Sequence, residues 1–82
     1  MIKLVRENDG KTIIGSKVRW VEWESEFFKE THTKPAVGLS CIVDPSINYT
    51  WLTTQITELL KETDELVKFK TKNSIYTLYY EN

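Results

Sequence analysis

The stretch that decides the fold reads Leu66-Val67-Lys68-Phe69-Lys70-Thr71. Apolar side chains alternate with lysines along it, which is the period of a β-strand with one buried and one solvated face. Turn residues flank this strand, with Thr63-Asp64-Glu65 before it and Lys72-Asn73 after it. Residues 74–80 are then expected to form a closing strand, so the C-terminal part is predicted to be an antiparallel meander.

The segment before this meander, residues 49–62, allows two interpretations. Leu52, Ile56, Leu59 and Leu60 follow helical spacing. Tyr, Trp and four Thr residues in the same segment favour a strand, because β-branched and aromatic side chains fit a pleated surface. We favour a strand in which Leu52, Thr54, Ile56 and Leu60 share a face, and a helix remains the alternative.

The N-terminal half also shows the period of strands. Residues 2–6 and 11–14 are predicted to pair as a hairpin through a type I′ turn at Asp9-Gly10, before a break at Gly15-Ser16. Residues 17–31 are predicted to form one strand with Val21, Trp23 and Phe27 on its buried face and Glu22, Glu24 and Glu26 on its wet face.

An apolar run, residues 36–43, follows the interruption at Pro35 and is closed by Asp44-Pro45-Ser46. Its length favours a strand buried on both faces. These elements together predict an all-β fold, a small antiparallel barrel or strongly curled sheet of five to seven short strands. Residues 1–82 are expected to form a single domain.

Composition limits the classes of function. The chain has 11 basic and 12 acidic residues, a net charge of −1, so duplex DNA is not expected as a partner. No apolar run approaches the length of a membrane span, and the lone Cys41 fits a reducing compartment, so we expect a cytoplasmic protein. A chain of 82 residues can build only a thin hydrophobic core, which favours self-association, most simply as a dimer.

Two charged stripes and the aromatic residues supply the candidate binding surfaces. Glu22, Glu24 and Glu26 form a solvated face, a protein-facing acidic patch or a hard-cation site. Lys68, Lys70 and Lys72 form a wet face, an anion site together with nearby tyrosines, or a partner for the glutamate stripe within one chain or across a dimer.

Trp20 falls on the carboxylate side of its strand, where it is exposed, in contact with a partner or stacked on a ligand, whereas Trp23 is expected in the core. Cys41 is expected to be buried and unreactive, and His32 to lie on the surface. We predict no catalytic residue, cofactor or metal. The candidate residues for binding a ligand or partner are Trp20, Trp51, Lys68, Lys70, Asn73 and Tyr76.

The segments Thr50-Trp51-Leu52-Thr53-Thr54-Gln55-Ile56-Thr57-Glu58 and Phe69-Lys70-Thr71-Lys72-Asn73-Ser74-Ile75-Tyr76-Thr77-Leu78 resemble the ending of many short phage and mobile-element proteins. In that group a strand of the form T-x-S/T-x-(V/I) precedes a final T-x-N-S-x-Y-x-L strand. The chain departs from the group at Gln55, where Pro is common. The resemblance implies an origin in a phage or integrated element and carries over no functional residue.

We therefore expect a non-enzymatic binding protein in the cytoplasm of a host cell, acting on a host process such as an immune system. Three alternatives remain. A sequestering protein for a small anionic nucleotide needs an aromatic-lined pocket with inward cations. A nucleic-acid accessory protein needs the lysines and tyrosines on one exposed surface. A structural virion or assembly protein needs large apolar self-contacts.

Overall fold

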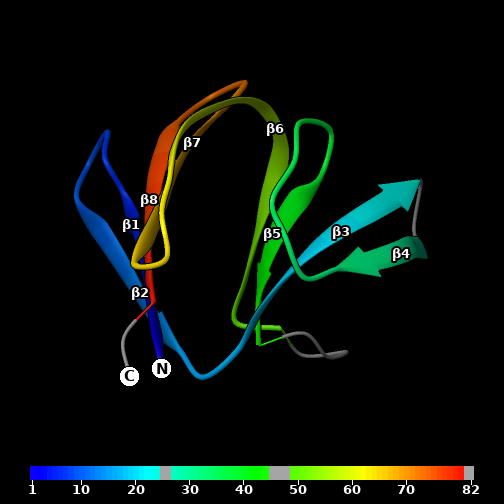
Figure 1. Ribbon diagram of the computed structural model, residues 1–82, viewed down its shortest axis with the longest axis horizontal. Coiled ribbons are helices and arrows are strands. Elements are labelled where there is room, and N and C mark those ends of the chain that lie inside the picture. Colours follow the sequence, from blue (N-terminus) through cyan, green and yellow to red (C-terminus); the bar gives the residue numbers. More distant parts are fainter. Residues whose placement is uncertain (25–26, 45–48, 81–82) are drawn as a thin grey trace.

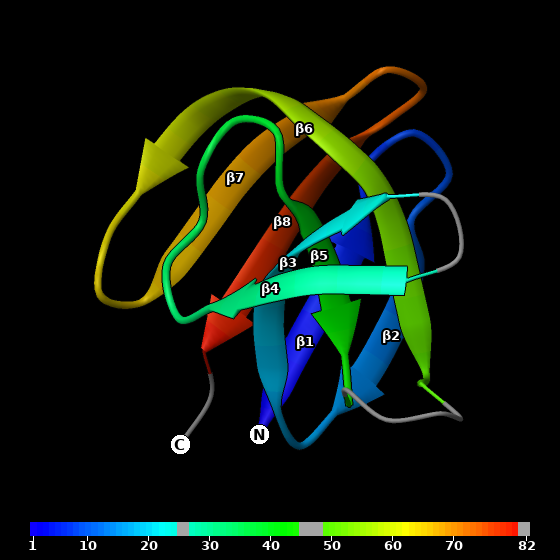
Figure 2. The same cartoon turned by 90° about the vertical axis from the view of Figure 1, so that its right-hand side faces the viewer.

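The computed structural model describes residues 1–24, 27–44 and 49–80, with the backbone course alone for 23–24 and 27–31. Within these residues it has eight strands: β1 (Ile2–Arg6), β2 (Lys11–Gly15), β3 (Val18–Glu24), β4 (Phe27–His32), β5 (Ser40–Val43), β6 (Trp51–Glu62), β7 (Leu66–Thr71) and β8 (Ile75–Tyr80). They form one sheet in the order β2-β1-β8-β7-β6-β5-β3-β4, with antiparallel pairs throughout. The sheet is strongly curled, which confirms the predicted all-β class (Figures 1 and 2).

The first hairpin confirms the predicted pairing but not its turn. Ile2 lies opposite Gly15 and Arg6 opposite Lys11. Of the two turn residues only Gly10 has a positive φ, of 73°, so the turn is not of type I′. Gly10 N donates to Arg6 O at 2.8 Å, and the Asp9 carboxylate accepts from Lys11 N and from the Arg6 guanidinium. A four-residue connection held by Asp9 therefore replaces the two-residue turn.

The prediction of a single strand over residues 17–31 is wrong. The chain reverses within this stretch, and β3 and β4 pair antiparallel with a register shift between Glu22 and Trp23. Alternation describes each arm of a hairpin as well as it describes one long strand, so periodicity could not locate the reversal. The extra strand takes the total one beyond the predicted upper limit of seven.

The apolar run 36–43 forms a strand only over its second half. Ser40, Cys41, Ile42 and Val43 are all buried, as predicted for a strand covered on both faces. Residues 36–39 form a turn instead, because Gly38 takes a φ of +95°. Residues 45 and 46 of the predicted closing turn lie outside the described residues.

The ambiguous segment 49–62 is a strand, and the helix alternative is wrong. β6 pairs with β5 over its first part and with β7 over its second. Register shifts interrupt both pairings, so the buried positions are Thr53 and Ile56, and Thr54 is exposed. β6, β7 and β8 form the predicted meander, with Val67, Phe69 and Thr71 facing inward.

Phe69 lies at the centre of the core. Its ring meets Trp20 edge to face, with centroids 5.5 Å apart at 84°, and stacks on Tyr76 at 5.3 Å and 17°. Such pairs add about 0.5–1.5 kcal/mol beyond the area that they bury. The side chains packed around them come from seven strands and from the connection before β5: Ile2, Leu4, Ile13, Val18, Leu39, Cys41, Val43, Ile56, Val67 and Leu78.

Asp44 connects three parts of the chain at one end of the sheet. Its carboxylate accepts from Ser16 N at 2.8 Å, from Ser16 Oγ, from Lys17 N and from Thr50 Oγ1 at 2.8 Å. These bonds, first of all that from the Ser16 backbone, lower the pKa of Asp44 from 3.8 to about 2. Asp44 therefore fixes the β2–β3 connection against β5 and the start of β6.

We predict that Asp44→Ala lowers the free energy of unfolding by on the order of 2 kcal/mol, because several hydrogen bonds to a charged group are lost. The folded pKa lies below the unfolded value, so the stabilisation by the carboxylate is present above about pH 4 and is lost as the pH falls toward 2. Asp44→Asn keeps the side-chain shape and tolerates the positive φ of 54°. Urea denaturation between pH 2 and 5 should therefore show a smaller loss and a flatter pH profile for this variant; an unchanged profile would contradict the assignment.

Candidate functional site

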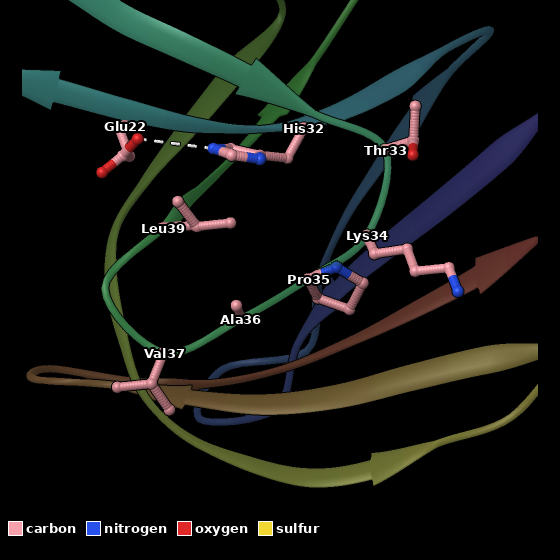
Figure 3. A pocket seen from close by; sticks show the side chains of 8 residues that line it. All are labelled: Glu22, His32, Thr33, Lys34, Pro35, Ala36, Val37 and Leu39. Atoms are coloured by element: carbon pink, nitrogen blue, oxygen red, sulfur yellow. Dashed lines mark hydrogen bonds and ion pairs between the residues drawn. The ribbon is translucent and has the colours of Figure 1, made fainter.

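A hollow of about 460 Å³ opens between the β3–β4 hairpin and the residues that follow it. We call it the hairpin groove. Figure 3 shows its lining, which comes from β3, the end of β4 and the connection to β5: Glu22, His32, Thr33, Lys34, Pro35, Ala36, Val37 and Leu39. The volume falls in the range of small-ligand sites, yet the groove is open to solvent along its length.

The apolar wall of the groove is held rigidly by backbone hydrogen bonds. Gly38 N donates to Ile56 O at 2.9 Å, and Ile56 N donates to Leu39 O at 2.8 Å. Leu39 N also donates to Ala36 O, which closes the turn. Pro35 and Leu39 are buried, whereas the Val37 side chain is 62% exposed at the lip. The wall is thus formed before any ligand arrives.

The polar rim consists of a carboxylate and an imidazole. Glu22 Oε2 lies 3.4 Å from His32 Nε2, and each side chain is about two-fifths exposed. The two residues belong to neighbouring strands, so the hairpin register sets their separation. Lys34 extends away from Glu22 (Figure 3). The rim offers hydrogen bonding to an incoming polar group, and the wall offers apolar contact.

Cys41 lies outside the groove, in the core. It is fully buried, and burial raises the pKa of its thiol, which keeps it protonated near neutral pH. The prediction that it is buried is confirmed. No group of three or more His, Cys, Asp or Glu side chains that could hold a metal ion is found in the described parts of the chain.

Two of the predicted binding residues lie in the core. Trp20 is fully buried against Phe69, so the prediction of an exposed or ligand-stacking ring is wrong. Trp20 pairs with Cys41 of β5, whereas Glu22, on the same face of β3, lies beyond the end of that pairing. This face of β3 is therefore buried at Trp20 and exposed to solvent at Glu22. Tyr76 is buried because its register partner is the inward-facing Phe69. Its ring therefore lies on the side of the sheet opposite to Lys68 and Lys70.

Trp51 is half-buried at the start of β6. Its ring carries two cations, with Lys11 Nζ 4.5 Å and Arg6 Cζ 5.5 Å from the ring centroid. Its indole N–H is buried without a hydrogen-bond partner among the described residues. The Trp51 ring therefore packs against the β1–β2 hairpin. The sequence alone does not predict this contact, because it joins strands that are far apart in the chain.

Lys68 and Lys70 lie on the outer face of β7, and Asn73 is exposed in the turn that follows. The structure brings the two lysines together and separates them from Trp20, Trp51 and Tyr76. β5 and β6 lie between β3 and β7, so pairing of Glu22 with the lysines within one chain is wrong. The side chains of Glu24 and Glu26, and that of Trp23, lie outside the described residues.

Sequence reasoning missed the hairpin groove. Its apolar wall was predicted to be part of a strand, and its His32 was expected on the surface without a role. Pro35 and Gly38 were the available signal, because both residue types mark a break in a strand.

The chain matches no protein-family model, no curated protein and no solved structure. In the residues that the structure describes, no helix is long and apolar enough to cross a membrane. The groove and its chemistry are therefore the basis for a functional proposal.

We predict that Cys41 reacts with a thiol reagent only when the protein opens, because its sulfur is buried and protonated. Labelling by 5,5′-dithiobis(2-nitrobenzoic acid) should be slow in buffer and fast in urea. Cys41→Ser should fold with a loss of about 1–2 kcal/mol, since a hydroxyl replaces a thiol in an apolar site. Rapid labelling of the folded protein would contradict the burial.

Proposed function

We propose that this chain is a non-enzymatic binding protein that takes an extended segment of a partner protein into the hairpin groove. The observation that carries the proposal is the position of the groove at the end of β4, which is one of the two terminal strands of the sheet. A terminal strand can pair with an added strand through its backbone, while an adjoining hollow accepts alternate side chains. Val37, Pro35 and Leu39 provide the apolar surface for such a side chain.

The groove supports a protein segment better than a small anionic nucleotide. A nucleotide needs aromatic walls and inward cations. The wall described here is aliphatic, the rim carries the Glu22 carboxylate beside the His32 imidazole, and Lys34 is directed away from Glu22. An open groove also suits a chain that enters and leaves it.

The finer form of the proposal makes the partner a host protein in the cytoplasm and the role an antagonism of a host process. Its support is the resemblance of residues 50–58 and 69–78 to short phage and mobile-element proteins. Site-specific photo-crosslinking in bacterial cells tests it, with the crosslinker at position 37 and, as control, at position 14. A host protein captured at 37 and not at 14 is the expected result.

We predict that Val37→Asp weakens binding of groove-selected peptides by roughly tenfold or more, since a central apolar contact contributes about 1–2 kcal/mol. Peptides would be selected from a displayed random library and measured by fluorescence anisotropy. Tyr49→Asp is the matched control, because Tyr49 is 43% exposed just before β6 and does not line the groove. Equal effects of both variants, or no selected peptide, would refute the proposal.

Self-association stays a prediction. β2 and β4 are the terminal strands of the sheet, where a second copy could pair, and Ile14 is an exposed apolar side chain on β2. Light scattering at tens of micromolar should give twice the mass of one chain. Ile14→Lys should shift that mass toward the monomer, because a charge on an edge strand opposes pairing; the mass of one chain for the unmodified protein would end the idea.

A further inference from the structure

Three lysines gather on the outer face of β6 and β7. Lys61 lies directly opposite Lys68 in the β6–β7 register, and Lys70 follows Lys68 on the same face. A register shift between Leu59 and Lys61 produces this juxtaposition. Strands in a sheet lie about 4.8 Å apart, so Lys61 and Lys68 are immediate neighbours. We call these three residues the lysine face.

Two like charges lie side by side on the lysine face, at Lys61 and Lys68. Like charges directly opposite each other on a sheet are destabilising. Among the described residues, none of the three lysines forms an ion pair within 4 Å. Two carboxylates lie near the lysine face: Glu58 is opposite Lys70 in the register, and Glu7 accepts a hydrogen bond from Thr77, the residue opposite Lys68.

An aromatic ring adjoins the lysine face. Tyr79 of β8 lies opposite Leu66, which places it diagonal to Lys68 on the same surface. It is half-buried, and Lys3 Nζ of β1 lies 5.0 Å from its ring centroid. Between them, Thr77 lies opposite Lys68 and donates to Glu7 Oε1. Lysines of β6, β7 and β1 thus lie on the same surface as the Tyr79 ring and the Glu7 carboxylate.

We infer that the lysine face binds the phosphate backbone of a single-stranded nucleic acid. Lysine binds phosphate as a compact point charge, and charges spread over several strands suit a row of phosphates better than one. A base can stack on Tyr79 when Lys3 moves from its ring, as in sheets that bind single strands without sequence preference. The lysine face lies on the outer side of the sheet, and none of its residues lines the hairpin groove, which lies beside the β3–β4 hairpin (Figure 1).

The test measures binding of a fluorescein-labelled oligo(dT) to the full chain by anisotropy, between about 50 and 200 mM salt. The double variant Lys61→Gln/Lys68→Gln should weaken binding roughly tenfold at the lower salt. Each phosphate contact contributes about 0.7 to the salt slope of a single strand, so the slope should become shallower by about 1.4. Tyr79→Leu should weaken binding with the slope unchanged, because it removes stacking and no charge.

The matched control is Lys11→Gln/Lys17→Gln, which removes the same charge from exposed positions on and after β2. It should bind within about twofold of the unmodified protein. Thermal melting followed by circular dichroism separates a loss of folding from a loss of binding. Lys61→Gln alone should raise Tm, because it removes the like-charge pair with Lys68. The inference would be overturned if the unmodified protein did not bind oligo(dT), or if the control lost as much binding as the double variant. Equal binding of a poly-glutamate peptide would also overturn it, because that result would indicate an acidic protein partner.

Discussion

The two parts of the sheet share β6, and the curl of the fold depends on how that strand divides its pairing. Its first part bonds to β5 and its second to β7, with register shifts along both. Bulges of this kind bend a strand and increase its twist. The bend brings β3 over β7, where Trp20 meets Phe69 edge to face. A straight β6 would hold β3 away from β7, so the bulges of β6 and the contact between Trp20 and Phe69 depend on each other.

The hairpin groove follows from the same geometry. β3 pairs with β5 only as far as Val21 opposite Ser40, and the β3–β4 hairpin continues beyond that point. The chain then returns through residues 33–39 to bond with β6 at Ile56. A hollow remains between the projecting hairpin and the returning segment, because none of the strands in the described residues fills the space between them. The groove is thus formed where the sheet is incomplete. Glu22 faces it because it lies past the covered end of β3, and His32 faces it from the end of the neighbouring strand β4.

The alternation of side chains along the sequence predicted correctly, within single strands such as β7, which residues face inward or outward. The alternation of residues 66–71 placed Phe69 inward and Lys68 outward correctly, and the apolar character of residues 40–43 predicted burial on both faces. It could not locate a chain reversal inside an alternating stretch, nor a bulge that shifts the inward positions of β6. Trp20 shows the limit most clearly, because its burial depends on where β5 ends, which is a property of the assembled sheet. The groove was missed for the same reason.

Net charge alone is a poor guide to the partners of a folded chain. A total of −1 argues against a polyanion, but only if the charges are mixed evenly over the surface. Here Asp9 is paired with Arg6 at 2.6 Å and Glu22 lies beside His32, both away from β7. Pairing of β6 with β7 meanwhile places Lys61 against Lys68. Strand order thus separates charges that composition averages, so a nearly neutral chain can present a positive face.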